Sequence, residues 1–169
     1  MLAELRLENY AVIDNVAIEF ASGLNLLTGE TGAGKSILID ALGLLLGDKA
    51  SSDVIRRGAE RAVVAAVFES DGAAARAIEA ILETNGLDAE NGSLILRREI
   101  VPGGKGRVFI NNQPATVAVL KQIAPHLSLI HAQNESIANF DAAARQELLD
   151  AYAGVELKDV ATAFNSTPA

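Results

Sequence analysis

The sequence predicts a mixed α/β lobe in which antiparallel strands pack beside a strand–loop–helix unit. Three observations support this fold class. Two segments within the first twenty residues alternate apolar and polar side chains at period two, the pattern of half-buried strands. The glycine-rich turn GETGAGKS then separates the apolar run LNLL from the apolar run ILIDALGLLLG. After it, helix-like and strand-like segments follow one another, and half of the 169 residues are hydrophobic, which suffices for a buried core.

The segments around the glycine-rich turn predict three strands and a helix. Residues 5–8 and 16–20 alternate at period two, and the link NYAVIDN between them carries turn formers. Residues 22–29, SGLNLLTG, predict a short apolar strand that runs into the turn. Residues 35–46 follow a helical pattern rich in Ile, Leu and Ala, and Gly47 marks its end.

The middle of the chain predicts a strand, a helix and a hairpin. Residues 47–61 are polar and loop-like, and residues 61–70, RAVVAAVFES, form a strand too apolar to be fully exposed. Its place directly after the helix and loop suits an antiparallel edge strand. Residues 71–86 predict a helix that starts at an aspartate and stops at Asn-Gly. Residues 93–101 and 107–112 predict a hairpin around the glycines of PGGKG.

The last part of the chain predicts two helices and a strand. Residues 116–123 form a helix ended by Pro125. Residues 126–136, HLSLIHAQNES, predict a short buried strand that runs into a polar loop, and residues 141–165 are helical with an incomplete apolar stripe. The two histidines of HLSLIHAQNES lack a third ligand nearby, so they are interpreted as ordinary strand-end residues rather than metal ligands.

Composition and charge exclude several kinds of protein. The formal charge of −8, from 14 Lys and Arg against 22 Asp and Glu, argues against a broad nucleic-acid surface, which needs clustered cations. With no cysteine, the chain has no disulfide, zinc–thiolate site or cysteine nucleophile. The charged start MLAELRLENY is unlike a signal peptide, and no apolar run approaches the roughly 18 residues of a membrane span. We therefore expect a soluble cytoplasmic protein without a membrane partner.

The glycine-rich turn matches the phosphate-binding pattern G-x-x-x-x-G-K-[ST] in full. Its backbone N–H groups must point at a polyphosphate, which needs backbone angles and a close approach that a Cβ would obstruct. Lys35 is placed for a catalytic contact with the β- and γ-phosphate oxygens, and Ser36 offers a hydroxyl to a bridging magnesium ion. The residues expected to hold the nucleotide are Gly29, Glu30, Thr31, Gly32, Ala33, Gly34, Lys35 and Ser36. The turn therefore predicts a nucleoside triphosphate site with Mg²⁺.

Hydrolysis of a triphosphate needs more than this turn. A P-loop ATPase also uses a carboxylate at a strand end to hold magnesium and another to orient the attacking water. Glu69 ends the strand that suits a sheet edge, and Glu99 stands beside two arginines, as in a surface ion pair. Neither makes a convincing second motif. Binding of a triphosphate is therefore predicted without a complete catalytic site.

Five segments in a fixed order point to a family. They are LENYAVIDNVAIEF, GLNLLTGETGAGKSILIDALGLLLG, DVIRRGAERAVVAAVF, LIHAQNE and ELLDAYAG. In this order they resemble the N-terminal part of the RecN family, DNA-repair ATPases related to SMC proteins with an ABC-type head. The resemblance covers nearly the whole chain up to about Val155, and the run TGETGAGKSILIDALGLLLG is specific well beyond a generic P-loop.

The resemblance implies the N-terminal lobe of an ABC/SMC-type P-loop ATPase head, with a mixed sheet and antiparallel edge strands. Residues 1–152 would be the N-terminal half of the head, and residues 153–169 the start of a coiled-coil arm or a truncated tail. In this family the signature motif and the Walker B strand belong to the C-terminal half, and neither occurs here, in agreement with the missing carboxylate. The implied partners are ATP, Mg²⁺, DNA, the C-terminal half of the head and a second copy in a homodimer. The implied location is a bacterial cytoplasm, at the nucleoid during repair.

The resemblance also implies roles for residues outside the turn. Gln133 would be the glutamine-loop residue that reaches magnesium and the attacking water, a catalytic role. Ala132 and Asn134 stand where the family usually has Gly and His, so the loop departs from the family pattern. Arg56 would be the arginine of a loop that comes near the nucleotide. Its neighbour Arg57 leaves the register open, and a surface charge is the alternative for either arginine.

Two further features have interpretations of their own. Asn9 and Tyr10 lie in a strand-turn that family members place near the adenine edge. A basic cluster occupies the expected hairpin, and its members are Arg97, Arg98, Lys105 and Arg107. A contact with the DNA backbone and a solvated hairpin are both open for this cluster, with the solvated hairpin preferred.

The leading interpretation is the ATP-binding half of an SMC-like ATPase in DNA double-strand break repair and recombination, with ATP binding and hydrolysis driving head engagement. The complete protein would be an ATPase, and this chain alone would bind ATP without turnover. Two alternatives from other classes stay open. One is a small P-loop kinase, which would need an arginine-bearing lid, and the other is a non-catalytic ATP-sensing module.

Overall fold

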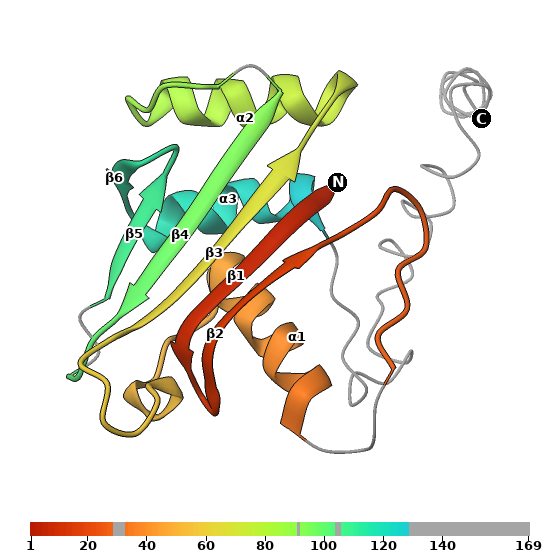
Figure 1. Ribbon diagram of the computed structural model, residues 1–169. Helices are drawn as coiled ribbons and strands as arrows, with labels where there is room; N and C mark the ends of the chain where they lie inside the picture. The colour runs from red at the N-terminus through yellow and green to blue at the C-terminus, as the bar shows by residue number, and fades with distance from the viewer. Residues whose placement is uncertain (29–32, 91, 104–105, 129–169) are drawn as a thin grey trace, which may run out of the picture. The chain divides into compact units, whose positions relative to one another are not determined.

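The computed structural model describes residues 1–28, 33–90, 92–103 and 106–128 (Figure 1). The elements in chain order are β1 Leu2–Tyr10, β2 Ile13–Glu19, α1 Ala33–Leu45, the 3₁₀ turn η1 Ser52–Val54, β3 Ala62–Glu69, α2 Gly72–Thr84, β4 Ser93–Ile100, β5 Arg107–Ile110, β6 Gln113–Ala115 and α3 Val117–Leu127. The helices predicted for residues 35–46 and 71–86 are confirmed, and so is the hairpin predicted for the segment that forms β4 and β5.

In the described part of the chain, six strands form one sheet in the order β2-β1-β3-β4-β5-β6, and each pairing is antiparallel. The sheet and the helices together confirm the predicted α/β class. The predicted edge position of β3 is wrong, because β3 pairs with β1 on one side and with β4 on the other. Both faces of β3 are apolar, and such a strand is stable where neighbours cover it. Val63 on the outer face is 8% exposed, and the buried inner positions are Ala62, Val64, Ala66 and Phe68.

The strand predicted for residues 22–29 is not formed in the part that the structure describes, residues 22–28. Leu24, Leu26 and Leu27 are 88%, 75% and 45% exposed. A strand needs a neighbour for its backbone N–H and C=O groups, and none of the described strands pairs with this segment. The prediction is therefore wrong for these residues, and three large apolar side chains face solvent.

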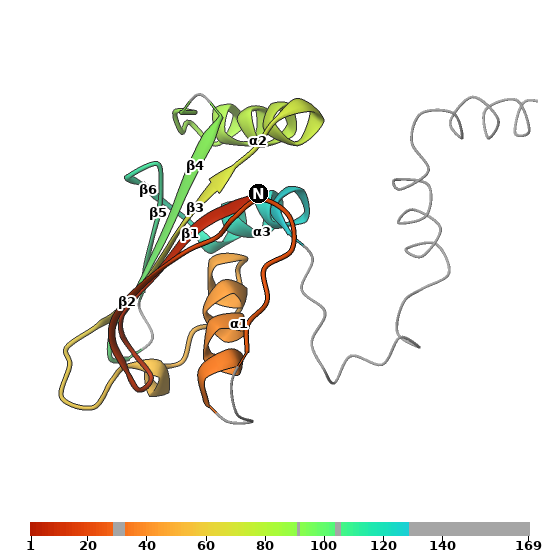
Figure 2. The same cartoon turned by 45° about the vertical axis from the view of Figure 1, so that its right-hand side comes forward.

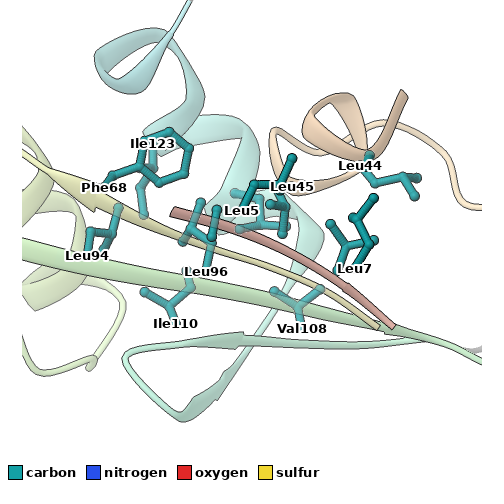
Figure 3. Packing of buried hydrophobic residues seen from close by; sticks show 14 of the residues in the cluster. Leu5, Leu7, Leu44, Leu45, Phe68, Leu94, Leu96, Val108, Ile110 and Ile123 are labelled. Atoms are coloured by element: carbon teal, nitrogen blue, oxygen red, sulfur yellow. The ribbon is translucent and has the colours of Figure 1, made fainter. Parts of the chain in front are cut away.

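The core lies on one face of the sheet, which α1 and α3 cover (Figures 1 and 2). Figure 3 shows Leu44 and Leu45 of α1 and Ile123 of α3 on the same side of the sheet as Leu5 and Leu7 of β1. These five side chains are at most 5% exposed. Each such buried side chain contributes roughly 1.5–3 kcal/mol. Packing on the sheet therefore holds α1 against this face.

The C-terminal end of α1 is closed by the predicted glycine. Gly47 has φ +107°, and its amide donates to the carbonyl of Leu44 at 3.3 Å. The amide of Asp48 donates to the carbonyl of Gly43 at 3.0 Å. These two bonds form a Schellman motif, which needs a residue with positive φ at the position of Gly47. The helix end opposite the glycine-rich turn is thus held by backbone bonds.

Helix α3 is longer than predicted. Thr116 caps its start by accepting from the amide of Val119, as expected for a threonine at this position. Pro125, predicted to end the helix, lies inside its last turn. Because the helix ends two residues later, the missing N–H of the proline removes one bond only, and the amide of Ser128 still donates to Ala124 at 3.3 Å. His126, predicted on a strand, therefore lies in a helix.

Strand β6 was not predicted. Asn111 and Asn112 have φ +49° and +61°, the positive values that both central residues of a type I′ hairpin turn require. Asparagine tolerates this conformation, so the pair Asn-Asn is the sequence feature that indicates the turn before β6. The side chain of Asn111 also accepts from the amide of Ile95 at 2.9 Å and donates to the carbonyl of Asp88 at 3.0 Å.

Several predictions fall on residues outside the described part of the chain. They concern the remainder of the strand, residues 129–136, the helix over residues 141–165 and the arm over residues 153–169. By its own contacts the chain divides into Met1–Ile130 and His131–Ala169. The boundary near residue 152 stays a prediction. Within the described ranges, the helices are too short or too polar for any of them to cross a membrane.

Candidate nucleotide-binding site

The N-terminal end of α1 has the properties of an anion-binding end. Ala33, Gly34, Lys35 and Ser36 open the helix, and residues 29–32 lie outside the described part of the chain. The first amides of a helix have no intrahelical acceptor, and the helix dipole is positive there. The first turn carries no acidic residue that would oppose an anion. A Cβ built on Gly34 would meet open space, so the glycine leaves room at this turn for a ligand.

A hollow of about 590 Å³ lies against this turn. Its lining residues are Ile13, Val16, Ile18, Leu27, Thr28, Gly34, Lys35 and Leu38. Three of them come from β2, and most are aliphatic, while Lys35 supplies a positive charge. A cationic end beside an apolar wall suits a ligand with an anionic part and a flat apolar part, as a nucleotide has. The contribution of β2 was not predicted, since alternation indicates a strand but not what its apolar face touches.

Arg56 and Arg57 line a different hollow, of about 460 Å³. The guanidinium of Arg56 donates to Oδ1 of Asp14 at 2.8 Å, and its backbone amide donates to the carbonyl of Asn9 at 2.9 Å. The loop after α1 is thereby tied to the β1–β2 hairpin. The structure does not bring Arg56 into the hollow at Lys35, and its role toward a nucleotide stays a prediction. Asp14, which holds it, was not singled out in the sequence.

Tyr10 packs into the core and not toward a ligand. Its side chain is 2% exposed, and burial, with the charge of Asp40 on α1 as a second cause, raises the pKa of Tyr10 to about 12. The predicted place near an adenine does not fit this buried ring. Asn9 lines the hollow of the two arginines, and Ala11 in the turn after β1 is held at φ +51°.

Arg98 contradicts both interpretations of the basic cluster. It is 6% exposed and donates to the carbonyl oxygens of Leu44 at 2.6 Å and Asp48 at 2.5 Å. Burial lowers the pKa of Arg98, and the charge of Asp48 opposes this shift. Because neighbouring residues of a strand point to opposite faces, Arg97 faces outward while Arg98 faces the core. Arg98 is therefore neither a DNA contact nor part of a solvated surface.

The ion pair predicted at Glu99 is confirmed, but its carboxylate is buried. Glu99 is 5% exposed, and Arg97 donates to its carboxylate. The guanidinium of Arg61 lies 3.9 Å from the same carboxylate, and that of Arg97 lies 5.1 Å from the ring centroid of Phe109. The charge of Glu99 is thus compensated on the outer face of the sheet, which leaves it unsuited to a magnesium ion at the glycine-rich turn.

The remaining candidates add no carboxylate to the site. Glu69 is exposed at the end of β3, where its amide donates to the carbonyl of Met1 at 2.8 Å. Arg107 is exposed on β5, while Lys105 and Gln133 lie outside the described residues. In the part of the chain that the structure describes, no three His, Asp or Glu side chains gather closely enough to hold a metal ion. The assignment of a phosphate site to the glycine-rich turn stays a prediction, and neither Glu69 nor Glu99 is placed to complete it.

Comparison with known proteins places the chain in a family. The model of the AAA domain family matches residues 4–164. The DNA repair protein RecN is 39% identical over 162 residues in Halalkalibacterium halodurans, 35% over 158 in Bacillus subtilis and 41% over 154 in Xylella fastidiosa. These alignments cover 95%, 94% and 90% of this chain, respectively. The chain spans only 28%, 27% and 27% of the length of these relatives.

Solved structures share the fold. A structure from work on ATP-driven dimerization and DNA stimulated activation of SMC ATPases has a TM-score of 0.62 at 21% identity, over 88% of this chain and 97% of that one. The SMC head domain from Thermotoga maritima has a TM-score of 0.52 at 23% identity, over 69% of this chain and 39% of that one. At such identities the likeness establishes the fold, that of a P-loop ATPase head lobe. The chain belongs to the AAA domain family, and within that family its sequence is similar to the DNA repair protein RecN.

Proposed function

We propose that this chain is the ATP-binding half of an SMC-like ATPase that acts in DNA double-strand break repair and recombination. The observation that carries the proposal is the complete P-loop motif of the sequence, whose described part opens α1 beside a hollow with a cationic end and an apolar wall. Similarity to RecN proteins along at least 90% of the chain supports the assignment to repair. Since these relatives are bacterial, we place the protein in the bacterial cytoplasm, at the nucleoid during repair.

In this proposal the backbone amides, a lysine and a hydroxyl each contribute to holding the triphosphate and its metal ion. The amides of residues 29–34 bind phosphate oxygens, and Lys35 neutralises charge on the β- and γ-phosphates. Ser36 and Gln133 would hold Mg²⁺, which would neutralise part of the negative charge of the triphosphate. The Ser36 hydroxyl fits this role, because it is a hard oxygen donor on an exposed residue at the helix start. Arg56 would exchange its contact with Asp14 for one with the nucleotide.

Exposed apolar side chains support a partner for this lobe. Leu24, Leu26 and Leu27 are exposed before the glycine-rich turn, and Ile39 on α1 is 39% exposed. Large apolar side chains that gather on a surface mark interaction sites. We propose that the C-terminal half of the head, with its signature and Walker B motifs, covers them and offers residues 22–28 a strand to pair with. Two such heads would then form a homodimer around two ATP molecules, which would couple turnover to DNA.

Calorimetric titration with Mg²⁺–ATP, together with a turnover assay, tests the proposal on this chain. We expect binding without turnover. Lys35→Ala should weaken binding by about tenfold or more, because a charge-assisted contact contributes about 1.5–3 kcal/mol. Lys49→Ala is the matched control, since it removes an exposed lysine beyond the other end of α1 and should leave the affinity unchanged.

Two outcomes would contradict the proposal. If Lys35→Ala leaves the affinity for Mg²⁺–ATP unchanged, the assignment of the phosphate site is refuted. Steady turnover that Lys35→Ala abolishes would show that the catalytic carboxylate lies within this chain. The proposal that the chain holds only half of the catalytic site would then be refuted. Omission of Mg²⁺ should reduce the affinity in the wild-type protein and have little further effect in a Ser36→Ala variant.

The two alternatives are not favoured by the comparisons, and each has its own test. A small kinase would release ADP from ATP once a phosphate acceptor is added, so the absence of ADP release in the presence of candidate acceptors argues against it. An ATP-sensing module would bind ATP and stay inactive after the C-terminal half is added. The proposed ATPase should then gain turnover, and linear DNA should increase the rate.

A further inference from the structure

A buried arginine holds the end of α1 that lies opposite the phosphate-binding turn. Nη1 of Arg98 donates to the carbonyl of Leu44 at 2.6 Å and to the carbonyl of Asp48 at 2.5 Å. Leu44 belongs to the last turn of α1, and Asp48 closes its C-terminal motif. The carbonyl of Leu44 also accepts from the amide of Gly47, and carbonyls at a helix C-terminus form the negative end of the helix dipole. The guanidinium therefore gives a cationic donor to this end of the helix.

The position of Arg98 in the sheet is one where an aliphatic residue is expected. In the strand register it lies between Val64 of β3 and Val108 of β5, in a row that continues to Leu7 of β1. The three neighbours are at most 6% exposed. Removing a cation from water is unfavourable, and a well-packed aliphatic side chain would avoid that cost. The two bonds to α1 and its following turn are what the guanidinium provides here and an aliphatic residue cannot.

We propose that Arg98 is a positioning residue for the nucleotide site: it fixes the axis of α1 on the sheet and thereby the places of Lys35 and Ser36 against a triphosphate. The proposal rests on the proposed function. Helix α1 has 13 residues and is therefore about 20 Å long. A tilt of about 3° around its C-terminal end would move its N-terminal end by about 1 Å. Displacements of that size can reduce a rate on the order of a hundredfold.

Apolar packing alone does not determine this axis. Ala41 and Leu45 of α1 are fully buried against the sheet, and such contacts resist separation of the two layers. The hydrophobic effect has no direction, however, so it opposes small rotations of a helix on a sheet only weakly. Hydrogen bonds weaken steeply when their angles change. The two hydrogen bonds from Arg98 to carbonyl groups therefore orient the axis of α1, which apolar packing alone does not do.

The test compares two substitutions of Arg98 with one of its neighbour in the row. Arg98→Met keeps much of the side-chain length but loses the charge and the donors, and Arg98→Lys keeps the charge with a different donor geometry. Val64→Ala is the matched control, because it reduces packing in the same row without a hydrogen bond to α1. Mg²⁺–ATP affinity should fall about tenfold or more in Arg98→Met and less in Arg98→Lys. It should change by less than about twofold in Val64→Ala.

A second readout does not depend on the nucleotide. Amide hydrogen exchange over residues 34–42, in the N-terminal part of α1, should accelerate in Arg98→Met more than in Val64→Ala when the two are compared at equal stability. Equal affinities and equal exchange in these two variants would reduce Arg98 to a structural residue and overturn the proposal. If Arg98→Met does not fold, Arg98→Lys carries the same comparison.

The outcomes separate this proposal from the proposed function. Failure of the wild-type chain to bind Mg²⁺–ATP would refute the proposed function, and the exchange experiment would then decide alone whether Arg98 orders the start of α1. Normal ATP binding by wild type together with unchanged exchange and affinity in Arg98→Met would refute the role of Arg98 and leave the function standing.

Discussion

Replacement of Gly47 by alanine should destabilise the protein through two separable effects. The first is conformational: Gly47 has φ +107°, and a left-handed conformation costs an alanine roughly 1–2 kcal/mol. The second is steric, because a Cβ at this position would lie 2.6 Å from Cγ of Lys121 on α3. Moving that side chain off its preferred rotamer costs about 1 kcal/mol. The expected loss in the free energy of unfolding is therefore about 2–3 kcal/mol.

Urea unfolding followed by circular dichroism measures this loss and can separate its two parts. With a slope of about 1–3 kcal/mol per M, the midpoint should fall by about 1 M or more. Gly58→Ala is the matched control, since Gly58 has φ +89° and no atom within 4 Å of a built Cβ. It should show the conformational part alone, about 1–2 kcal/mol. In the double variant Gly47→Ala/Lys121→Ala the steric part should disappear, since Lys121 no longer carries a Cγ.

Two results would refute this reasoning. Equal losses in Gly47→Ala and Gly58→Ala would show that the contact between the end of α1 and α3 accommodates a Cβ. A loss below about 0.5 kcal/mol in Gly47→Ala would show that the position does not need positive φ. The Schellman motif at the end of α1 would then be wrong.

Further predictions concern a titration, a buried ion pair and a turn. The free energy of unfolding should fall as pH rises from about 10 through about 12, because Tyr10 stays protonated in the folded protein while its unfolded counterpart ionises. The titration of Tyr10 can be followed by phenolate absorbance in a Tyr152→Phe variant, in which Tyr10 is the remaining tyrosine. A midpoint near about pH 10 would contradict the buried ring. Glu99→Gln should lower the free energy of unfolding by about 1–3 kcal/mol, since its arginines lose a buried carboxylate. Glu4→Gln removes a carboxylate whose partner, Arg6, is 67% exposed, so it should leave the urea midpoint unchanged, and equal shifts in Glu99→Gln and Glu4→Gln would refute the distinction between the two pairs. Ala11→Gly should raise the thermal midpoint, because alanine at φ +51° is disfavoured by roughly 1 kcal/mol, and a lower midpoint would mean that packing of the methyl group outweighs this term.

Features that depend on local backbone chemistry were predictable from the sequence. The pattern GETGAGKS indicates where α1 begins, and Gly47 indicates where it ends, because phosphate turns and helix C-termini demand glycine for stated geometric reasons. The hairpin of β4 and β5 follows from alternation and glycines in the same way. These predictions need no knowledge of what lies next to the segment in space.

Features that depend on neighbours were not predictable. Period two places Arg98 on the same face as Leu96 and Ile100, but the usual exposure of arginine led to the opposite interpretation, and only the end of α1 above it explains the burial. β3 has the composition of a central strand, yet its place after α1 suggested an edge. Residues 22–28 have the composition of a strand, but a strand forms only where another offers its backbone.

The pairing of β1 with β3 has a consequence for the order in which the nascent chain acquires its shape. Leu5 pairs with Ala66, and Leu7 with Val64, so the contact closes a loop of about 60 residues. α1 lies within that loop, and β1 leaves the ribosome long before β3 is synthesised. Loop closure of this length slows folding, since its entropy must be overcome before the contacts form. A nascent chain that stops before β3 has only the β1–β2 hairpin on which to seat the helix, and should therefore not yet hold a nucleotide.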